Sequence, residues 1–165
     1  MMVNINDKVF IQKPNSKQTA IIRKYMHPVE LNLEKLRNSL CAGKTIQPAI
    51  LDDEGNFVSQ QVFFVDVDSS TVTETKKRAK KYNLWPNIIY RTFSGGNRHR
   101  VVFVLDEPIT DLRERNDIMM ILIQKFKGDT KPQALKSLFY GGTLSYMFNP
   151  FKYLKKEEVL RYGDV

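Results

Sequence analysis

Hydrophobic and polar positions alternate most clearly over residues 61–68, which read QVFFVDVD. Successive side chains of a β-strand point to opposite faces of the sheet. One face of this strand would carry Val62, Phe64, Asp66 and Asp68, and the other would carry Phe63, Val65 and Val67. The pattern therefore predicts a strand with one wholly apolar face, which packs on a core, and a second face that begins apolar and ends acidic.

The rest of the pattern predicts strands and helices interleaved along the chain. The expected strands, rich in β-branched and aromatic residues between turn signals, are residues 9–13, 18–25, 48–51, 87–93 and 101–105. The expected helices, marked by helical spacing and by capping residues, are residues 33–42, 71–82, 111–127 and 130–140. Several neighbouring strands are hairpin-like, so the order predicts an α+β or split βαβ fold rather than a doubly wound sheet.

Composition narrows the class of protein. The 165 residues suffice for one domain with a sizeable core, and no apolar run approaches the length of about 20 residues that spans a membrane. Cys41 is the only cysteine, which excludes an internal disulfide and a cysteine-based zinc site. The N-terminus also lacks the apolar core of a signal peptide, so we expect a cytoplasmic protein. The net charge of +8 favours an anionic partner such as nucleic acid or nucleotide.

The two carboxylates of the central strand predict a metal site. Asp66 and Asp68 would stand about 7 Å apart on one face, where two like charges repel unless a cation lies between them. Carboxylate oxygens are preferred ligands of Mg²⁺ and Mn²⁺. The alternative is that the strand simply ends in a polar turn, with both acids solvated.

Three further features carry candidate chemistry. A glycine-rich link, SGGNRHR, joins two expected strands and holds Ser94, Arg98 and His99. Its glycines do not precede a helix, so they are not a dinucleotide fingerprint. Asp129 and Lys44 each follow a helix stop. Carboxylates with two metal ions, beside a basic loop that binds phosphates, are what nucleotidyl transfer requires.

Each candidate also has a structural interpretation. His99 can be a partly buried histidine that caps the link, and Ser94 can be a turn residue. Asp129 can cap the next helix, and Lys44 can be a cation favoured at a helix end. Arg98 and Arg100 can be ordinary surface charges. Lys76, Lys77 and Lys80 can form a solvated helix face, with contact to the backbone of a nucleic-acid template as the alternative.

The order of these motifs resembles the archaeo-eukaryotic primase (AEP) superfamily, in its plasmid- and phage-borne primase-polymerase branch. The matching motifs are FFVDVD, then N-R-H before the apolar run VVFVL, then Asp129. The surrounding segments GKTIQPAILDDEG, RVVFVLDEPI and FYGGT resemble replication primases of mobile genetic elements. The resemblance covers roughly residues 35–143. Two departures are Asn97, where the family often has serine two residues before the histidine, and the absence of a zinc site.

The resemblance implies an RRM-like antiparallel catalytic sheet flanked by helices, with an N-terminal αβ unit that completes the active-site cleft. It implies that Asp66, Asp68 and Asp129 hold Mg²⁺ or Mn²⁺, and that His99, helped by Arg98, contacts the phosphates of an incoming NTP or dNTP. It implies primer synthesis on single-stranded DNA, with extension of the primer as a further activity. We expect a catalytic domain over residues 1–150 and a helical tail, the start of a linker to further domains such as a helicase, over residues 151–165.

Two other functions compete with this one. An RRM-like domain that has lost catalysis would bind single strands by stacking bases on aromatic residues beside basic ones, for example Tyr90, Arg91 and Phe93. Such a module has no reason to place two acids on one face. A rolling-circle nicking enzyme needs a histidine pair, and the chain has only His27 and His99, far apart in sequence.

Overall fold

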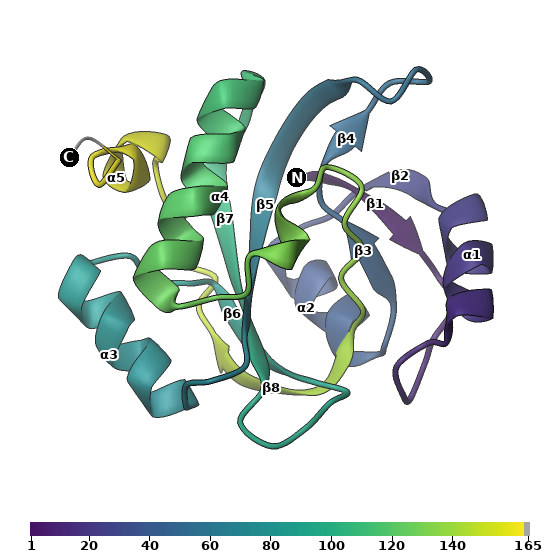
Figure 1. The fold of residues 1–165 in the computed structure, drawn as a ribbon, viewed down its shortest axis with the longest axis horizontal. Coiled ribbons are helices and arrows are strands. Elements are labelled where there is room, and N and C mark those ends of the chain that lie inside the picture. The colour runs from purple at the N-terminus through teal and green to yellow at the C-terminus, as the bar shows by residue number, and fades with distance from the viewer. Residues whose placement is uncertain (164–165) are drawn as a thin grey trace.

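A computed structural model describes residues 1–163 of the chain and shows two antiparallel sheets with helices packed around them (Figure 1). The larger sheet has five strands in the order β4-β5-β7-β6-β8. Their bounds are β4 Ile50–Leu51, β5 Phe57–Val67, β7 His99–Ile109, β6 Ile88–Thr92 and β8 Gly142–Phe148. The central pair β5–β7 is long, and it carries the QVFFVDVD segment.

The core of this sheet is a split βαβ arrangement. Strand β5 leads through helix α3 (Val72–Tyr82) to β6, and β7 lies between them, antiparallel to both. Strands β5 and β6 are therefore parallel to each other and separated by one strand, as in ferredoxin-like and RRM-like sheets. Strand β8 pairs with the outer edge of β6.

One face of the large sheet is covered by α3, α4 (Leu112–Phe126) and α5 (Lys156–Leu160). The side chains of β5 on this face are Phe63, Val65 and Val67, all fully buried. The apolar face predicted from the alternation is therefore confirmed. Among residues 1–163, no helix is both long and apolar enough to cross a membrane.

The opposite face is covered by an N-terminal unit. Its elements are β1 Met2–Asn6, α1 Ser16–Lys24, β2 His27–Glu30, α2 Leu33–Cys41 and β3 Thr45–Gln47, with the sheet order β2-β1-β3. Leu36 and Leu40 of α2 share a buried cluster with Val62 and Phe64 of β5. The segment before β8 joins the two sheets, because Ile46 and Phe139 exchange backbone hydrogen bonds of 3.0 and 2.8 Å. The expected α+β fold, with an antiparallel sheet flanked by helices and an N-terminal αβ unit, is confirmed.

Three local predictions are wrong. Residues 18–25 are not a strand, because Asn15 and Gln18 form a capping box that starts α1. Residues 130–140 are not a helix: they form the short 3₁₀ turn η1 (Lys131–Gln133), a further turn after it, and an isolated β-bridge of Phe139 with Ile46. Residues 9–13 are irregular. The C-terminal segment is helical only in α5, which packs on α4, and residues 164–165 of the predicted tail lie outside the described part.

Candidate active site

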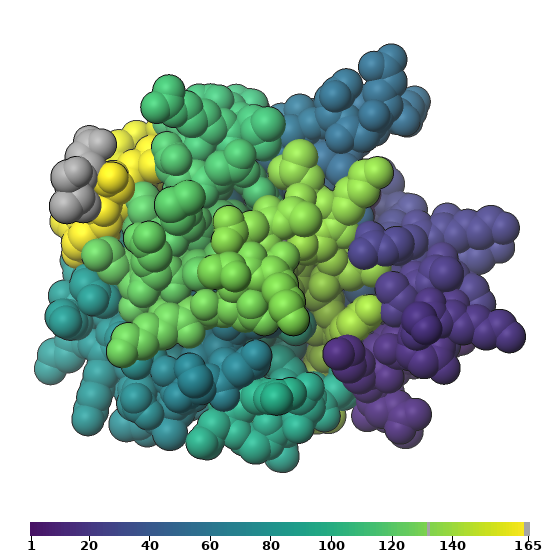
Figure 2. Space-filling view, viewed as in Figure 1, coloured from purple at the N-terminus to yellow at the C-terminus, as the bar shows by residue number. Residues whose placement is uncertain are grey.

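A cavity of about 350 Å³ lies where β5 ends, on the side of the sheet that faces the N-terminal unit. Three acidic side chains line it, Asp66, Asp68 and Asp129, together with four cationic ones, Lys13, Arg98, Arg100 and Lys131. Figure 2 shows this side of the molecule, where the purple N-terminal segment, the teal loop before β7 and the lime segment before β8 meet. The chain therefore brings both signs of charge together from four separate segments.

The register of β5 and β7 fixes which side chains face the cavity. Asp66 is paired with Arg100, and Val67 is paired with His99. Directly paired residues of an antiparallel pair project on the same face, so Arg100 lies on the face of Asp66 and His99 lies on the face of Val67. The predicted acidic end of β5 is present, with Asp66 partly buried and Asp68 exposed.

Asp129 reaches the cavity through a close approach of the chain to β5. Helix α4 ends at Phe126, and its C-cap residue Lys127 has a left-handed backbone with φ of 53°. A Cβ on Gly128 would lie 2.3 Å from Cγ1 of Val65, so only glycine fits there without a shift. The backbone N–H of Asp129 then donates to the carbonyl oxygen of Asp66 at 2.8 Å. This hydrogen bond ties the third acid to the strand that carries the other two.

Arg100 is the cation nearest to the acids. Its Nε donates to Oδ1 of Asp66, and its Nη1 donates to the Tyr90 hydroxyl at 2.8 Å and the Tyr140 carbonyl at 2.6 Å. Burial alone lowers the pKa of Arg100, but the interactions with Tyr90 and Asp66 outweigh it and raise that pKa above its ordinary value. Burial raises the pKa of Tyr90 to about 12. Arg100 is therefore a permanent cation, and Tyr90 stays a neutral hydroxyl.

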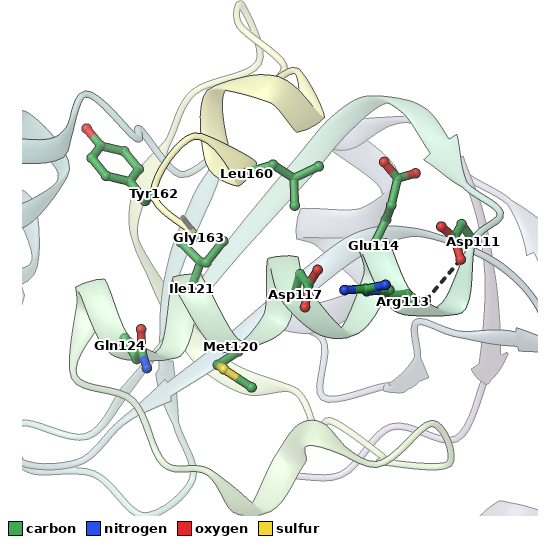
Figure 3. Close-up of a pocket in the computed structure, with 10 residues that line it drawn as sticks. All are labelled: Asp111, Arg113, Glu114, Asp117, Met120, Ile121, Gln124, Leu160, Tyr162 and Gly163. Atoms are coloured by element: carbon green, nitrogen blue, oxygen red, sulfur yellow. Dashed lines mark hydrogen bonds between the residues drawn. The ribbon is translucent and has the colours of Figure 1, made fainter. Parts of the chain in front are cut away.

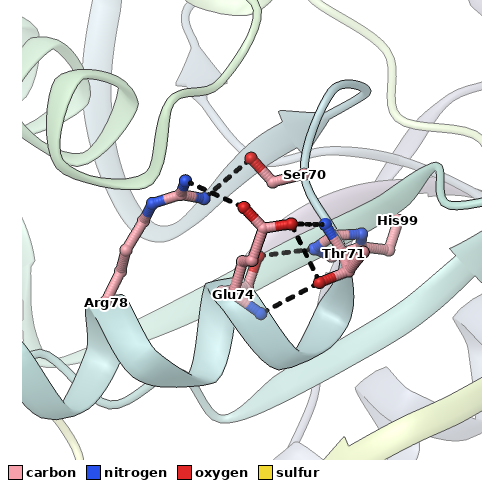
Figure 4. Close-up of polar contacts among 6 residues, drawn as sticks. Ser70, Thr71, Glu74, Arg78 and His99 are labelled. Carbon is pink, nitrogen blue, oxygen red and sulfur yellow. Dashed lines mark hydrogen bonds and ion pairs between the residues drawn. The ribbon is translucent and has the colours of Figure 1, made fainter.

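His99 lies on the opposite face and is 1% exposed. Its Nδ1 contacts the Asn97 carbonyl at 2.7 Å, and its Nε2 contacts the Thr75 hydroxyl at 2.7 Å. Figure 4 shows His99 together with polar residues of α3 and of the turn before that helix. Because a carbonyl oxygen only accepts, Nδ1 carries the proton and Nε2 accepts from Thr75. Burial is the main cause that lowers the pKa of His99, so the ring is neutral near pH 7. Both ring nitrogens are already used within the fold.

Of the predicted site residues, the structure brings Asp66, Asp68, Asp129, Ser94 and Arg98 to the cavity. Ser94 and Arg98 are exposed on the glycine-rich link, where Gly95 and Gly96 have positive φ angles of 69° and 61°.

Two other predicted site residues lie outside the set that lines the cavity: His99 and Lys44. The Nζ of Lys44 lies 3.6 Å from a carboxylate oxygen of Asp7 in the N-terminal unit. The predicted template-contacting residues Lys76, Lys77 and Lys80 are exposed on α3.

Arg100 was interpreted from the sequence as an ordinary surface charge, and Lys13, Lys131 and Tyr140 were not predicted as site residues. Arg100 follows His99 directly, and neighbouring residues of a strand project on opposite faces of the sheet, so the sequence did indicate that only one of the two could face the cavity. The sequence could not show which of the two residues faces the cavity. Residues 101–105 are apolar on both faces, so no alternation distinguishes one face of the strand from the other.

The donor set fits a hard divalent cation. Three carboxylates in one cavity supply the oxygen ligands that Mg²⁺ and Mn²⁺ prefer, with waters and phosphate oxygens completing the shell. As the side chains stand, no group of three or more His, Cys, Asp or Glu residues within 1–163 is close enough together to hold an ion. Oδ1 of Asp66 is also engaged by Arg100. Binding of an ion would therefore need the carboxylates to converge.

A second, larger cavity of about 610 Å³ lies between α4 and the C-terminal segment (Figure 3). Two of its three acids have structural partners. Asp111 caps α4 by accepting from the backbone N–H of Arg113 at 3.1 Å, and Glu114 pairs with Lys156 at 3.1 Å. These carboxylates stabilise the helix start and the docking of α5, so the smaller cavity is the better candidate for chemistry.

Comparison with known proteins places the fold. No protein-family model matches the chain, and no curated protein matches its sequence. Among solved structures, the chain is similar to the AEP domain of the primase-polymerase of cyanophage S-2L, with a TM-score of 0.61 and 14% sequence identity. The match covers 99% of this chain and 89% of the phage domain. The chain therefore has an AEP-like fold.

Proposed function

We propose that the chain is a metal-dependent nucleotidyltransferase of the primase-polymerase kind, which joins nucleoside triphosphates into primers on single-stranded DNA. One observation carries the proposal: three carboxylates and four cationic side chains from separate segments line a single cavity. Carboxylates suit divalent cations, and arginine and lysine suit phosphates. The AEP-like fold supports the proposal further.

The residues divide by charge. Asp66, Asp68 and Asp129 would hold Mg²⁺ or Mn²⁺, which when bound lowers the pKa of the attacking 3′-hydroxyl and neutralises the leaving pyrophosphate. Arg98 and Ser94 would orient the triphosphate through hydrogen bonds from the exposed link. Lys13 and Lys131 add positive charge at the rim, which raises the local concentration of nucleotide.

The partners follow from the same proposal. The exposed lysines of α3 would contact the backbone of the template without reading its sequence. The sequence motifs around the site support a role in replicating a mobile genetic element, with a replicative helicase domain or protein as a further partner. Extension of an existing primer is included in the proposed activity, because it uses the same site.

The test is primer synthesis on single-stranded DNA with labelled NTPs or dNTPs and Mg²⁺ or Mn²⁺. Wild type is compared with Asp66→Ala and Asp68→Ala, and with Asp117→Ala as a matched control, since Asp117 is an exposed acid beside the other cavity. We expect product from wild type and Asp117→Ala and none from the first two variants, with all four proteins folded. Product that persists in Asp66→Ala and Asp68→Ala would refute the assignment of the site. Extension of a pre-annealed primer separates a failure to start from a failure to polymerise.

One observation favours a second candidate, a single-strand-binding module without catalysis. The carboxylate of Asp66 is already paired with Arg100, which reduces its repulsion of a phosphate backbone. This candidate predicts no synthesis or extension by wild type under any metal condition, together with single-strand binding that Asp66→Ala and Asp68→Ala leave unchanged.

A further inference from the structure

The alternation of β7 separates two basic side chains that are neighbours in sequence. Arg100 is paired with Asp66 and lines the cavity, whereas His99 is paired with Val67 and is buried. A residue that binds nucleotide phosphates must carry hydrogen-bond donors into the cavity. His99 has none to spare, because Nδ1 donates to Asn97 and Nε2 accepts from Thr75. Arg100 therefore lies where a phosphate-binding residue is needed.

The guanidinium of Arg100 is partly committed. Nε donates to Asp66, and Nη1 donates to Tyr90 and Tyr140. Within residues 1–163, no side chain or carbonyl accepts a hydrogen bond from Nη2. The group also stands over two rings, at 5.6 Å from the Tyr90 centroid and 5.2 Å from that of Phe139. These contacts fix the plane of the guanidinium and leave only the N–H groups of Nη2 available to a ligand.

We propose that Arg100 binds the phosphates of the incoming nucleotide, and that its ion pair with Asp66 competes with this binding until a divalent cation occupies the Asp66 carboxylate. The inference rests on the proposed function and assigns to Arg100 the contact that the sequence motif predicted for His99. Cation and nucleotide would then favour each other's binding, because the cation releases the guanidinium and the phosphate accepts from it.

The competition can be measured without any metal. The probe is inorganic triphosphate, titrated calorimetrically into the full chain in EDTA. Asp66→Asn removes the ion pair and leaves the guanidinium free. Asp68→Asn is the matched control, because it removes the same charge from the same cavity and Asp68 has no ion pair in the described part of the chain. We expect Asp66→Asn to bind triphosphate about tenfold tighter than wild type, and Asp68→Asn no more than about threefold tighter.

A second substitution isolates the arginine. In the Asp66→Asn background, Arg100→Lys should abolish most of the gain, because one ammonium cannot present the parallel N–H groups of a guanidinium edge. The double variant keeps a cation and leaves no unpaired carboxylate, so its fold should survive, and circular dichroism checks this. As an independent readout, triphosphate should shift the Arg100 Nε–H signal in ¹⁵N NMR spectra more in Asp66→Asn than in wild type.

Equal triphosphate affinities of Asp66→Asn and Asp68→Asn would overturn the proposal. It would also be overturned if the gain in affinity of Asp66→Asn persisted after Arg100→Lys was added and triphosphate left the Arg100 Nε–H signal of Asp66→Asn unshifted. Primer synthesis by wild type tests the proposed function separately. A wild type that makes primers while Asp66→Asn and Asp68→Asn bind alike overturns only the role of Arg100. A wild type that makes no primers but shows the arginine-dependent gain supports the phosphate site and overturns the transferase.

Discussion

The two faces of the β5–β7 pair differ in almost every property, although they alternate residue by residue. On one face, His99 is buried under α3, neutral and fully hydrogen-bonded. On the other, Arg100 is charged and contacts an acid at the edge of a cavity. The difference teaches that the phase of a strand, rather than the identity of one residue in a motif, decides which side chain meets a ligand.

The way each face is covered explains the contrast. Three helices close the His99 face with a continuous apolar cluster, which excludes water. The N-terminal unit covers the Arg100 face only over its apolar part, where Phe64 stacks on Phe139 with ring centroids 4.5 Å apart. Beyond Phe64 the same face continues into Asp66 and the cavity. Core and candidate active site are therefore consecutive parts of one strand.

The largest effect should come from removing an acid on the Arg100 face. We expect Asp68→Ala to lower the rate of primer extension by about 100-fold or more, since a metal ligand is lost. Thr75→Val, which removes a hydrogen bond on the His99 face, should change that rate by less than about twofold. Single-turnover extension with both variants measures the contrast, and comparable losses would contradict the separation of the two faces.

A smaller effect on primer extension should follow from a substitution at Gly128, where the chain passes from α4 on the His99 face to Asp129 on the Arg100 face. Gly128→Ala would put a Cβ 2.3 Å from Val65 on one face and 3.1 Å from the carbonyl oxygen of Asp66. The resulting shift of Asp129 should lower extension by about tenfold. Overpacking should cost about 1–3 kcal/mol of unfolding free energy. Asp129→Asn is the comparison, because it removes the charge and keeps the backbone. Full activity of Gly128→Ala would show that the position of Asp129 is not important.

On the His99 face the expected effect is on stability. His99→Gln should lower the free energy of unfolding by about 1–3 kcal/mol, since a buried hydrogen-bond pair with Thr75 and Asn97 is disturbed. Triphosphate affinity should stay within about twofold of wild type. Urea unfolding and calorimetry measure the two quantities. A large loss of affinity in a stably folded variant would return the phosphate contact to His99.

The smallest effect concerns pH. Burial, aided by Arg78, lowers the pKa of His99, against the opposing effects of the Asn97 carbonyl and Asp68. The unfolded chain therefore binds a proton at this residue at higher pH than the folded protein does. Above pH 6.5, about the pKa of histidine in the unfolded chain, His99 is neutral in both states and its contribution to the free energy of unfolding is fully present. As the pH falls below that value, this contribution is lost by at most about 1.4 kcal/mol per pH unit.

Urea unfolding between pH 5 and 7 checks this sign. The wild-type free energy of unfolding should fall more steeply with decreasing pH than that of His99→Gln. His27→Gln is the control, because the His27 side chain is half exposed. Parallel curves for wild type and His99→Gln would mean that His99 titrates alike in both states.

The sequence predicted well what depends on local chemistry. The starts of the helices expected at 33–42, 71–82 and 111–127 were predicted from capping residues, and in the structure Asn32, Thr71 and Asp111 each cap their helix. The two faces of QVFFVDVD were predicted from alternation alone. These signals need no knowledge of distant segments.

What the sequence did not predict depends on contacts between distant segments. Strand β8 was not recognised, because its pairing with β6 and the extended segment before it are set by contacts such as Ile46 with Phe139. The strand expected at 18–25 was wrong because the Asn15 cap outweighed the β-branched pair Ile21 and Ile22. That Arg100 faces the cavity follows from the pairing register of β5 and β7, and this register cannot be predicted from the sequence of either strand alone.

The most direct test of the account is where a divalent cation binds. Mn²⁺ is titrated into ¹⁵N-labelled protein, and the paramagnetic broadening of each backbone amide signal is recorded. The account predicts broadening centred on Asp66, Asp68 and Asp129, with the link around Arg98 included, and its loss in an Asp66→Asn/Asp68→Asn double variant. Broadening centred instead on Asp111 and the acids beside it in the larger cavity, or left unchanged by the double variant, would contradict it.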